Sequence, residues 1–148
     1  MATAVQVVLD CADPARLARF WATALGYQTQ DPPAGYGTWE EWLLAQGVPE
    51  DQWNAANAVV DPEGRGPRLF FQRVPERKTV KNRFHLDLNV GGGFGTPAEE
   101  RRRRVDAEVE RLVEAGATKV GVATPSGPQD SGYCVNMRDP EGNEFDLV

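Results

Sequence analysis

His85 is the only histidine in the chain, and it lies in a stretch where polar and apolar residues alternate. Residues 83–90 read Arg-Phe-His-Leu-Asp-Leu-Asn-Val, which predicts a β-strand with His85, Asp87 and Asn89 on one face. An imidazole can serve as a general base, a hydrogen-bond donor or a metal ligand near neutral pH. It can also be purely structural, for example by hydrogen bonding to Asp87. We expect any chemistry to involve His85, and the structural alternative stays open.

The strand that carries His85 opens the second half of an internal repeat. Both halves read strand, helix, strand, strand, Asp-Pro-Glu-Gly turn, strand. Gln6 and His85 are 79 positions apart (85 minus 6), and the two turns begin 78 positions apart (139 minus 61). This shared spacing argues against coincidence. We predict two modules, residues 1–78 and 79–148, with any active site where the two halves face each other.

Capping residues and apolar spacing predict the main helices. Asp13-Pro14 is a favourable start for a helix that Gly26 ends, and Leu17, Phe20, Trp21, Ala24 and Leu25 form its apolar stripe. Thr96-Pro97 likewise starts a helix that Gly116 ends and that buries Val105, Val109, Leu112 and Val113. Strands are predicted at 5–11, 27–30, 58–60, 68–74, 83–90, 118–123, 133–138 and 143–148, with a loop at 125–132.

A tryptophan-rich insertion at about 38–57 interrupts the first module. Thr38 to Glu41 has the form of a capping box, in which Glu41 reaches back to the Thr38 N–H. A second short helix follows, and the insertion carries Trp39, Trp42 and Trp53. The insertion is either a lid or side wall of a ligand site, or a packing element that covers one end of a sheet.

Composition limits the classes of partner. A net charge of −6 and a pI of about 4.8 argue against binding to nucleic acid or to an anionic membrane. Arg101 to Arg104 point around a helix and have acidic neighbours, so they form a solvated face. The sequence has no signal-peptide pattern and no apolar run of the roughly 20 residues that span a bilayer. We expect a soluble cytoplasmic protein with a small-molecule ligand.

Four stretches carry a resemblance to a known family: Asp10 to Pro14, Leu69 to Glu76, His85 to Leu88, and Asp139 to Phe145. With the module order, they resemble the vicinal oxygen chelate superfamily of glyoxalases, bleomycin resistance proteins and extradiol dioxygenases, and especially its bacterial glyoxalase-like subgroup. The resemblance covers the chain except the tryptophan insertion. It implies an α+β fold in which two βαβββ modules form an open, cup-shaped mixed sheet. The sheet edges of such a fold leave room for a second copy, so a homodimer is compatible with it.

The same resemblance implies a metal site built from the first and last strands of each module. Carried over by position, its ligands to one divalent metal ion are Gln6, Gln72, His85 and Asp146, with Glu144 as a second candidate on the last strand. Two of these ligands are neutral amides, which bind a cation more weakly than carboxylates do. The lack of a second histidine argues against an iron-dependent ring-cleaving dioxygenase.

The same residues could instead form a metal-free pocket. His85 and Asp146 would then be the catalytic pair, with Gln6 and Gln72 orienting a carbonyl or hydroxyl group. The predicted substrate contacts are Trp21, Trp39, Trp42, Phe71 and Glu144.

Two functions follow from the resemblance. The first is a glyoxalase-like lyase or isomerase that acts on a small oxygenated metabolite between the modules. The alternative is a metal-free protein that sequesters an aromatic or planar small molecule, as the bleomycin resistance members do. Stoichiometric metal that is lost on changing His85 or Asp146 would separate the first from the second.

Overall fold

The computed structural model describes residues 2–93, 95–123 and 132–148, and the chain divides into two compact units, Met1–Arg77 and Lys78–Val148. We call them unit 1 and unit 2. The boundary expected from the sequence lies one residue further along the chain. Of the predicted loop at 125–132, all but Gly132 lies outside the described residues. No helix in the described ranges has the length and apolar character to cross a membrane.

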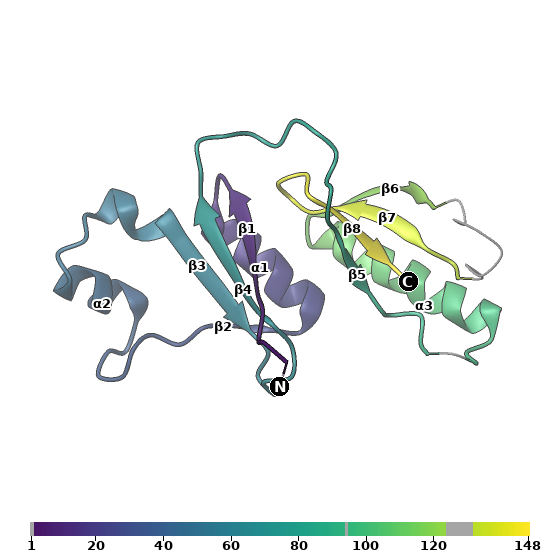
Figure 1. The fold of residues 1–148 in the computed structure, drawn as a ribbon, viewed down its shortest axis with the longest axis horizontal. Helices are drawn as coiled ribbons and strands as arrows, with labels where there is room; N and C mark the ends of the chain where they lie inside the picture. The colour runs from purple at the N-terminus through teal and green to yellow at the C-terminus, as the bar shows by residue number, and fades with distance from the viewer. Residues whose placement is uncertain (1, 94, 124–131) are drawn as a thin grey trace. The chain divides into compact units, whose positions relative to one another are not determined.

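Unit 1 is a four-stranded mixed sheet with a helix along one face (Figure 1). The strand order is β1–β4–β3–β2, in which β1 and β4 are parallel and the other neighbours are antiparallel. Its elements are β1 (Gln6–Cys11), α1 (Pro14–Leu25), β2 (Gln28–Thr29), α2 (Trp39–Ala45), the 3₁₀ helix η1 (Glu50–Ala55), β3 (Ala56–Val60) and β4 (Arg68–Arg73).

The predicted start and end of α1 are confirmed. The Asp13 carboxylate accepts the Arg16 N–H at 3.1 Å, and Gly26 ends the helix in the left-handed region with φ 67°. A residue without a side chain adopts that conformation at little cost. The apolar face of α1, including Leu17 and Trp21, is buried against β3 and β4. This packing forms the core of unit 1.

The tryptophan insertion forms α2 and η1, as predicted. The Thr38 hydroxyl accepts the Glu41 N–H at 3.1 Å and so caps α2. The prediction that the Glu41 carboxylate accepts the Thr38 N–H is wrong, because that carboxylate accepts the Gly37 N–H at 2.8 Å instead. In Figure 1, α2 lies on the side of β3 away from β1.

Unit 2 repeats this architecture with the order β5–β8–β7–β6, and α3 lies along one face of its sheet (Figure 1). Strands β5 and β8 are parallel and the other neighbours are antiparallel. Its elements are β5 (Leu86–Leu88), α3 (Ala98–Glu114), β6 (Thr118–Val122), β7 (Val135–Arg138) and β8 (Glu144–Leu147). The prediction of an α+β fold made of two βαβββ modules is confirmed.

Two details of unit 2 differ from the prediction. Pro97, not Thr96, occupies the position before α3, and no side chain there caps the helix. Val113 is exposed, whereas Val105, Val109 and Leu112 are buried. Val105, Val109 and Leu112 follow one another at helical spacing on the buried face of α3, and Val113 lies beside that face.

The ladder registers show which residues of the two units are equivalent. In unit 1, Val7 pairs with Leu69, and in unit 2, Leu86 pairs with Phe145. Leu69 and Phe145 are both buried. Side chains alternate between the two faces of a sheet, so the residues next to these pairs lie on the face away from the helix.

On that helix-free face, the two registers give an equivalent position in unit 1 for each residue of β5 and β8. On the first strand of each unit, His85 is equivalent to Gln6 and Asp87 to Val8. On the last strand, Glu144 is equivalent to Arg68 and Asp146 to Phe70. Gln72 therefore corresponds to Val148 rather than to a residue near His85. The physical reason is that the link between the Asp-Pro-Glu-Gly turn and the last strand is longer in unit 1, where the Asp61 carboxylate also accepts the Arg65 and Gly66 N–H groups.

Candidate functional site

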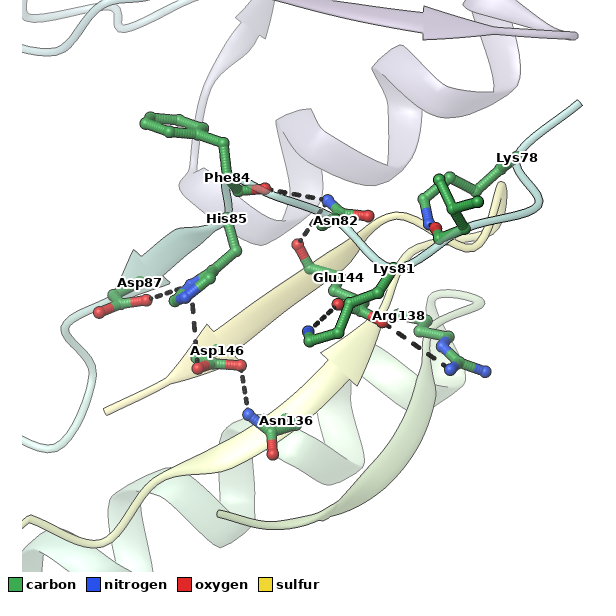
Figure 2. A network of polar contacts seen from close by, with 11 residues as sticks. Lys78, Lys81, Asn82, Phe84, His85, Asp87, Asn136, Arg138, Glu144 and Asp146 are labelled. Atoms are coloured by element: carbon green, nitrogen blue, oxygen red, sulfur yellow. Dashed lines mark hydrogen bonds and ion pairs between the residues drawn. The ribbon is translucent and has the colours of Figure 1, made fainter. Parts of the chain in front are cut away.

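One imidazole and two carboxylates meet on the helix-free face of unit 2, as Figure 2 shows. His85 Nδ1 lies 2.8 Å from Asp87 Oδ1 and 3.8 Å from Asp146 Oδ2. One potential ligand atom from each of the three residues lies within 4.8 Å of the others. We call His85, Asp87 and Asp146 the imidazole–carboxylate cluster.

The strands of unit 2 determine the position of each side chain in the cluster. Asp87 and Asp146 are paired across the parallel strands β5 and β8, so they lie on the same face. His85 is two residues before Asp87 and shares that face. Asn136 pairs with Asp146 from β7 and donates a hydrogen bond from Nδ2 to Asp146 Oδ1 at 2.7 Å. One oxygen of Asp146 is therefore held by Asn136, and the other points toward His85.

The cluster is open to solvent on one side. The side chains of His85 and Asp87 are 45% and 51% exposed, whereas that of Asp146 is 16% exposed. Asp146 is thus the fixed carboxylate, and His85 and Asp87 can be reached by a small molecule. With a neutral imidazole, two carboxylates give this patch a net negative charge that favours a cation.

Glu144 belongs to a neighbouring charged network. Its carboxylate pairs with the Lys81 ammonium, and a second oxygen lies 3.9 Å from Arg138 Nη2 (Figure 2). The hydrogen bond from Lys81 lowers the pKa of Glu144 below its ordinary value. Asn82 also donates to the Glu144 carbonyl at 3.4 Å. Glu144 is therefore occupied by cations of its own chain.

The predicted ligands of unit 1 do not come together. Gln6 Oε1 accepts a hydrogen bond from Arg68 Nη1 at 2.5 Å. Gln72 Nε2 donates to Asp10 Oδ1 at 2.8 Å, and Asp10 lies four residues beyond Gln6 on β1. Four residues of strand span about 13 Å. The residue beside Gln6 is a cation, which opposes metal binding there.

Two predicted substrate contacts are buried in the core. Trp21 and Phe71 are almost completely inaccessible to solvent, since both lie on the helix-facing side of the unit 1 sheet. Adjacent residues of a strand point to opposite faces, and for this reason Phe70, not Phe71, lines the open face. The prediction for Trp21 and Phe71 is corrected on this point.

Trp39 and Trp42 instead line a cavity of about 610 Å³ within unit 1. Its walls come from α2, η1, β3 and β4, and they include Trp53 and Phe70. The indole N–H of Trp39 donates to the Gln30 carbonyl at 2.7 Å, and that of Trp53 donates to the Val48 carbonyl at 2.9 Å. The tryptophan insertion therefore forms one wall of a cavity in unit 1.

The sequence profile of the family described as "Glyoxalase-like domain" matches residues 6–148. The chain belongs to the glyoxalase-like domain family. The match spans both units, tryptophan insertion included. A search of curated protein sequences finds no significant match.

Solved structures of this superfamily share the fold of this glyoxalase-like protein. A possible glyoxalase from Bacillus cereus is 18% identical, with a TM-score of 0.58, and the alignment covers 100% of this chain and 99% of that one. A glyoxalase/bleomycin resistance protein/dioxygenase family enzyme from Burkholderia phytofirmans is 15% identical, with a TM-score of 0.57 and coverage of 96% and 94%. These identities establish a common fold and leave the reaction to the residues of each site.

A third structure is a mutant of the fosfomycin resistance protein FosX from Listeria monocytogenes, in complex with manganese(II) and dihydroxypropylphosphonic acid. It is 12% identical, with a TM-score of 0.61, and the alignment covers 99% of this chain and 91% of that one. A member of the superfamily thus binds a divalent metal ion and a small oxygenated ligand.

The imidazole–carboxylate cluster suits a divalent cation. Carboxylate and imidazole groups are ligands that Mn²⁺, Zn²⁺ and related ions accept, and Asn136 supplies the outer hydrogen bond that orients a ligating carboxylate. The His85–Asp87 hydrogen bond is also the structural alternative that the sequence suggested. A cation held between these two side chains would replace that hydrogen bond.

Sequence reasoning missed Asp87 as a candidate ligand, and it missed Arg68 and Phe70 on the open face of unit 1. Asp87 could have been found, because period-two alternation already places it on the face of His85. Arg68 and Phe70 could have been found in the same way, because they alternate with Leu69 and Phe71 on β4 and share the face of Gln72.

Proposed function

We propose that this glyoxalase-like protein is a lyase or isomerase that acts on a small oxygenated metabolite at the imidazole–carboxylate cluster. The observation that supports this most is the convergence of His85, Asp87 and Asp146, the last of them oriented by Asn136. His85, Asp87 and Asp146 would hold one divalent cation. Such a cation supplies Lewis-acid polarisation of a carbonyl or hydroxyl oxygen of the ligand.

The chain's own residues account for the rest of this mechanism. The exposed ring of His85 can donate a hydrogen bond to a ligand from the nitrogen that the cation does not use. Asp146 orients that ring from the less exposed side and is itself held by Asn136. In the metal-free protein, Asp87 limits the rotation of His85 through the 2.8 Å contact, and a bound cation would replace that contact.

The test is a titration of metal-free protein with Mn²⁺, with bound metal measured by elemental analysis after gel filtration. We expect about one equivalent for the wild type and a loss of affinity of at least tenfold for His85→Ala and Asp146→Asn. Asp10→Asn is the matched control, because it removes a strand carboxylate that hydrogen bonds to Gln72 outside the cluster. Wild type without stoichiometric metal, or an equal loss in Asp10→Asn, would contradict the proposal.

A second function is supported by the cavity of unit 1. Its aromatic walls suit a protein that sequesters a planar small molecule without metal. A titration of metal-free protein with a planar aromatic ligand separates the two functions, because sequestration requires binding without metal and the same affinity in His85→Ala.

A further inference from the structure

The cavity of unit 1 has rigid aromatic walls. The indole N–H groups of Trp39 and Trp53 are both bonded to backbone carbonyls, which fixes the orientation of the two rings. Trp42 packs edge-on against Trp39, with ring centroids 5.6 Å apart. Phe70 contributes a further ring from β4. Because these indole donors are already used, Trp39 and Trp53 present apolar ring surface, and ordered walls reduce the entropy cost of binding a flat ligand.

Arg68 is the single basic residue among those that line the cavity. Its Nε donates to Gln30 Oε1 at 2.6 Å and its Nη1 to Gln6 Oε1 at 2.5 Å. Its guanidinium lies 5.0 Å from the centroid of the Phe70 ring. These contacts hold the guanidinium in place with two neutral amide acceptors and one aromatic face.

Across the described part of the chain, Arg68 forms no ion pair within 4.0 Å. The guanidinium has five N–H donors, of which the two amides use two. The acidic residue in the cavity lining is Glu40, which is exposed on α2 and makes no such pair with Arg68. A positioned, half-buried guanidinium with spare donors is therefore a site for an anionic group.

From these contacts we infer that the cavity of unit 1 binds a planar aromatic carboxylate, with its ring against the tryptophan wall and Phe70 and its carboxylate on Arg68. A volume of about 610 Å³ accommodates a ligand of one or two fused rings with substituents. The spare N–H donors of one guanidinium can pair with the two oxygens of one carboxylate. The inference names the ligand class of the second function proposed above, and it does not require metal at His85.

The experiment measures binding of three probes to the full-length protein by isothermal titration calorimetry, with and without Mn²⁺. The probes are naphthalene-2-carboxylate, its neutral primary amide and octanoate. We expect the aromatic carboxylate to bind at least tenfold more tightly than either of the others, because a charge-assisted hydrogen bond and an aromatic contact each contribute about one order of magnitude. Quenching of tryptophan fluorescence gives a second readout, since Trp39, Trp42 and Trp53 all line the cavity.

Substitutions of the basic and the acidic residue that line the cavity complete the test. Arg68→Gln should lower the affinity for naphthalene-2-carboxylate at least tenfold, so that the affinities for the acid and its amide lie within about twofold of each other. Arg68→Lys keeps a positive charge and should retain part of the preference for the acid. Glu40→Gln is the matched control, and it should bind the carboxylate at least as tightly as the wild type. Trp42→Leu should reduce the preference for the aromatic acid over octanoate.

Equal affinity of the wild type for the acid and its amide would overturn the inference. This comparison uses the wild-type protein alone, so it does not depend on whether a variant folds. So would the absence of binding at millimolar concentration, or unchanged affinity in Arg68→Gln with a wild-type melting temperature. Failure of the metal proposal gives a different result: probe binding persists while Mn²⁺ titration shows no stoichiometric site.

Discussion

Asp146 differs from the other members of the imidazole–carboxylate cluster because a neighbour in the sheet holds it. Its Oδ1 accepts the Asn136 amide at 2.7 Å, so the free oxygen faces His85. His85 and Asp87 contact each other at 2.8 Å, and both side chains are more exposed than that of Asp146. At the level of single residues, Asn136 therefore positions Asp146 within the imidazole–carboxylate cluster.

We predict that Asn136→Ala lowers the affinity for Mn²⁺ by about tenfold, because loss of an outer hydrogen bond typically costs 10- to 100-fold in metal affinity. Calorimetric titration of the metal-free protein measures this change. Asn89→Ala, which removes an exposed asparagine on the chain directly after β5, is the control and should leave the affinity within about twofold. An equal effect of the two substitutions would show that Asn136 has no specific role.

The family resemblance was sufficient to bring His85 and Asp146 together, since it placed them on the first and last strands of one module, and they lie 3.8 Å apart. It was insufficient for Gln72. That residue follows the longer link of unit 1, and a shift of register along a strand changes which partner lies opposite. Its amide consequently bonds to Asp10 instead of joining Gln6.

Among the elements, the two Asp-Pro-Glu-Gly turns have the same sequence but different burial. Asp139 is 3% exposed, and its carboxylate accepts the N–H groups of Glu141 and Asn143, both at 2.9 Å. Asp61 makes similar bonds in a turn that is more open to solvent. Both turns were recognisable from sequence, but the difference in burial was not, because it depends on tertiary packing.

We predict that Asp139→Ala lowers the free energy of unfolding by about 1–3 kcal/mol, since it leaves the partly buried N–H groups of Glu141 and Asn143 without their acceptor. Asp61→Ala should cost clearly less, because water can replace its carboxylate. Urea unfolding of the two variants and the wild type measures both changes. Comparable losses would show that burial of the turn does not determine its contribution.

The start of α1 gives a prediction about pH. The pKa of Asp13 is lowered from its ordinary value of 3.8, first by the hydrogen bond from Asn54 and then by the Arg16 N–H. A carboxylate with a lowered pKa in the folded state stabilises the protein fully above its unfolded pKa. That stabilisation is lost as the pH falls through the folded pKa.

Asp13→Ala should therefore lower stability by about 1–2 kcal/mol near pH 7, and the difference from the wild type should shrink below pH 3.8. Urea unfolding from pH 7 to pH 2.5 tests this. Asp31→Ala, at an exposed position, serves as control. A difference that stays constant over this range would contradict the assignment of the cap.

For the whole molecule, each unit has its own sheet, helix and buried core. Leu17 is buried in unit 1 and Leu112 in unit 2. All four tryptophans of the chain lie in unit 1, so tryptophan fluorescence reports unfolding of that unit, whereas far-UV circular dichroism reports both. The two signals can therefore be compared in one protein.

We predict that Leu17→Ala lowers the midpoint of the fluorescence transition and that Leu112→Ala leaves it unchanged while shifting part of the circular dichroism signal. Removing a fully buried leucine side chain costs about 2–5 kcal/mol, which is large enough to resolve. Thermal unfolding followed by both probes makes the measurement. A shift of the fluorescence midpoint in Leu112→Ala would show that the units unfold as one.

The equivalence of the two sheets has a consequence for how the repeat diverged. Where unit 2 has His85, Glu144 and Asp146, unit 1 has Gln6, Arg68 and Phe70, so equivalent positions of the two sheet faces differ in charge. A repeat of two identical halves would present the same chemistry twice. Under the two proposals above, the cation belongs to unit 2 and the aromatic anion to unit 1, so substitutions that make the two faces alike should remove one kind of binding without strengthening the other.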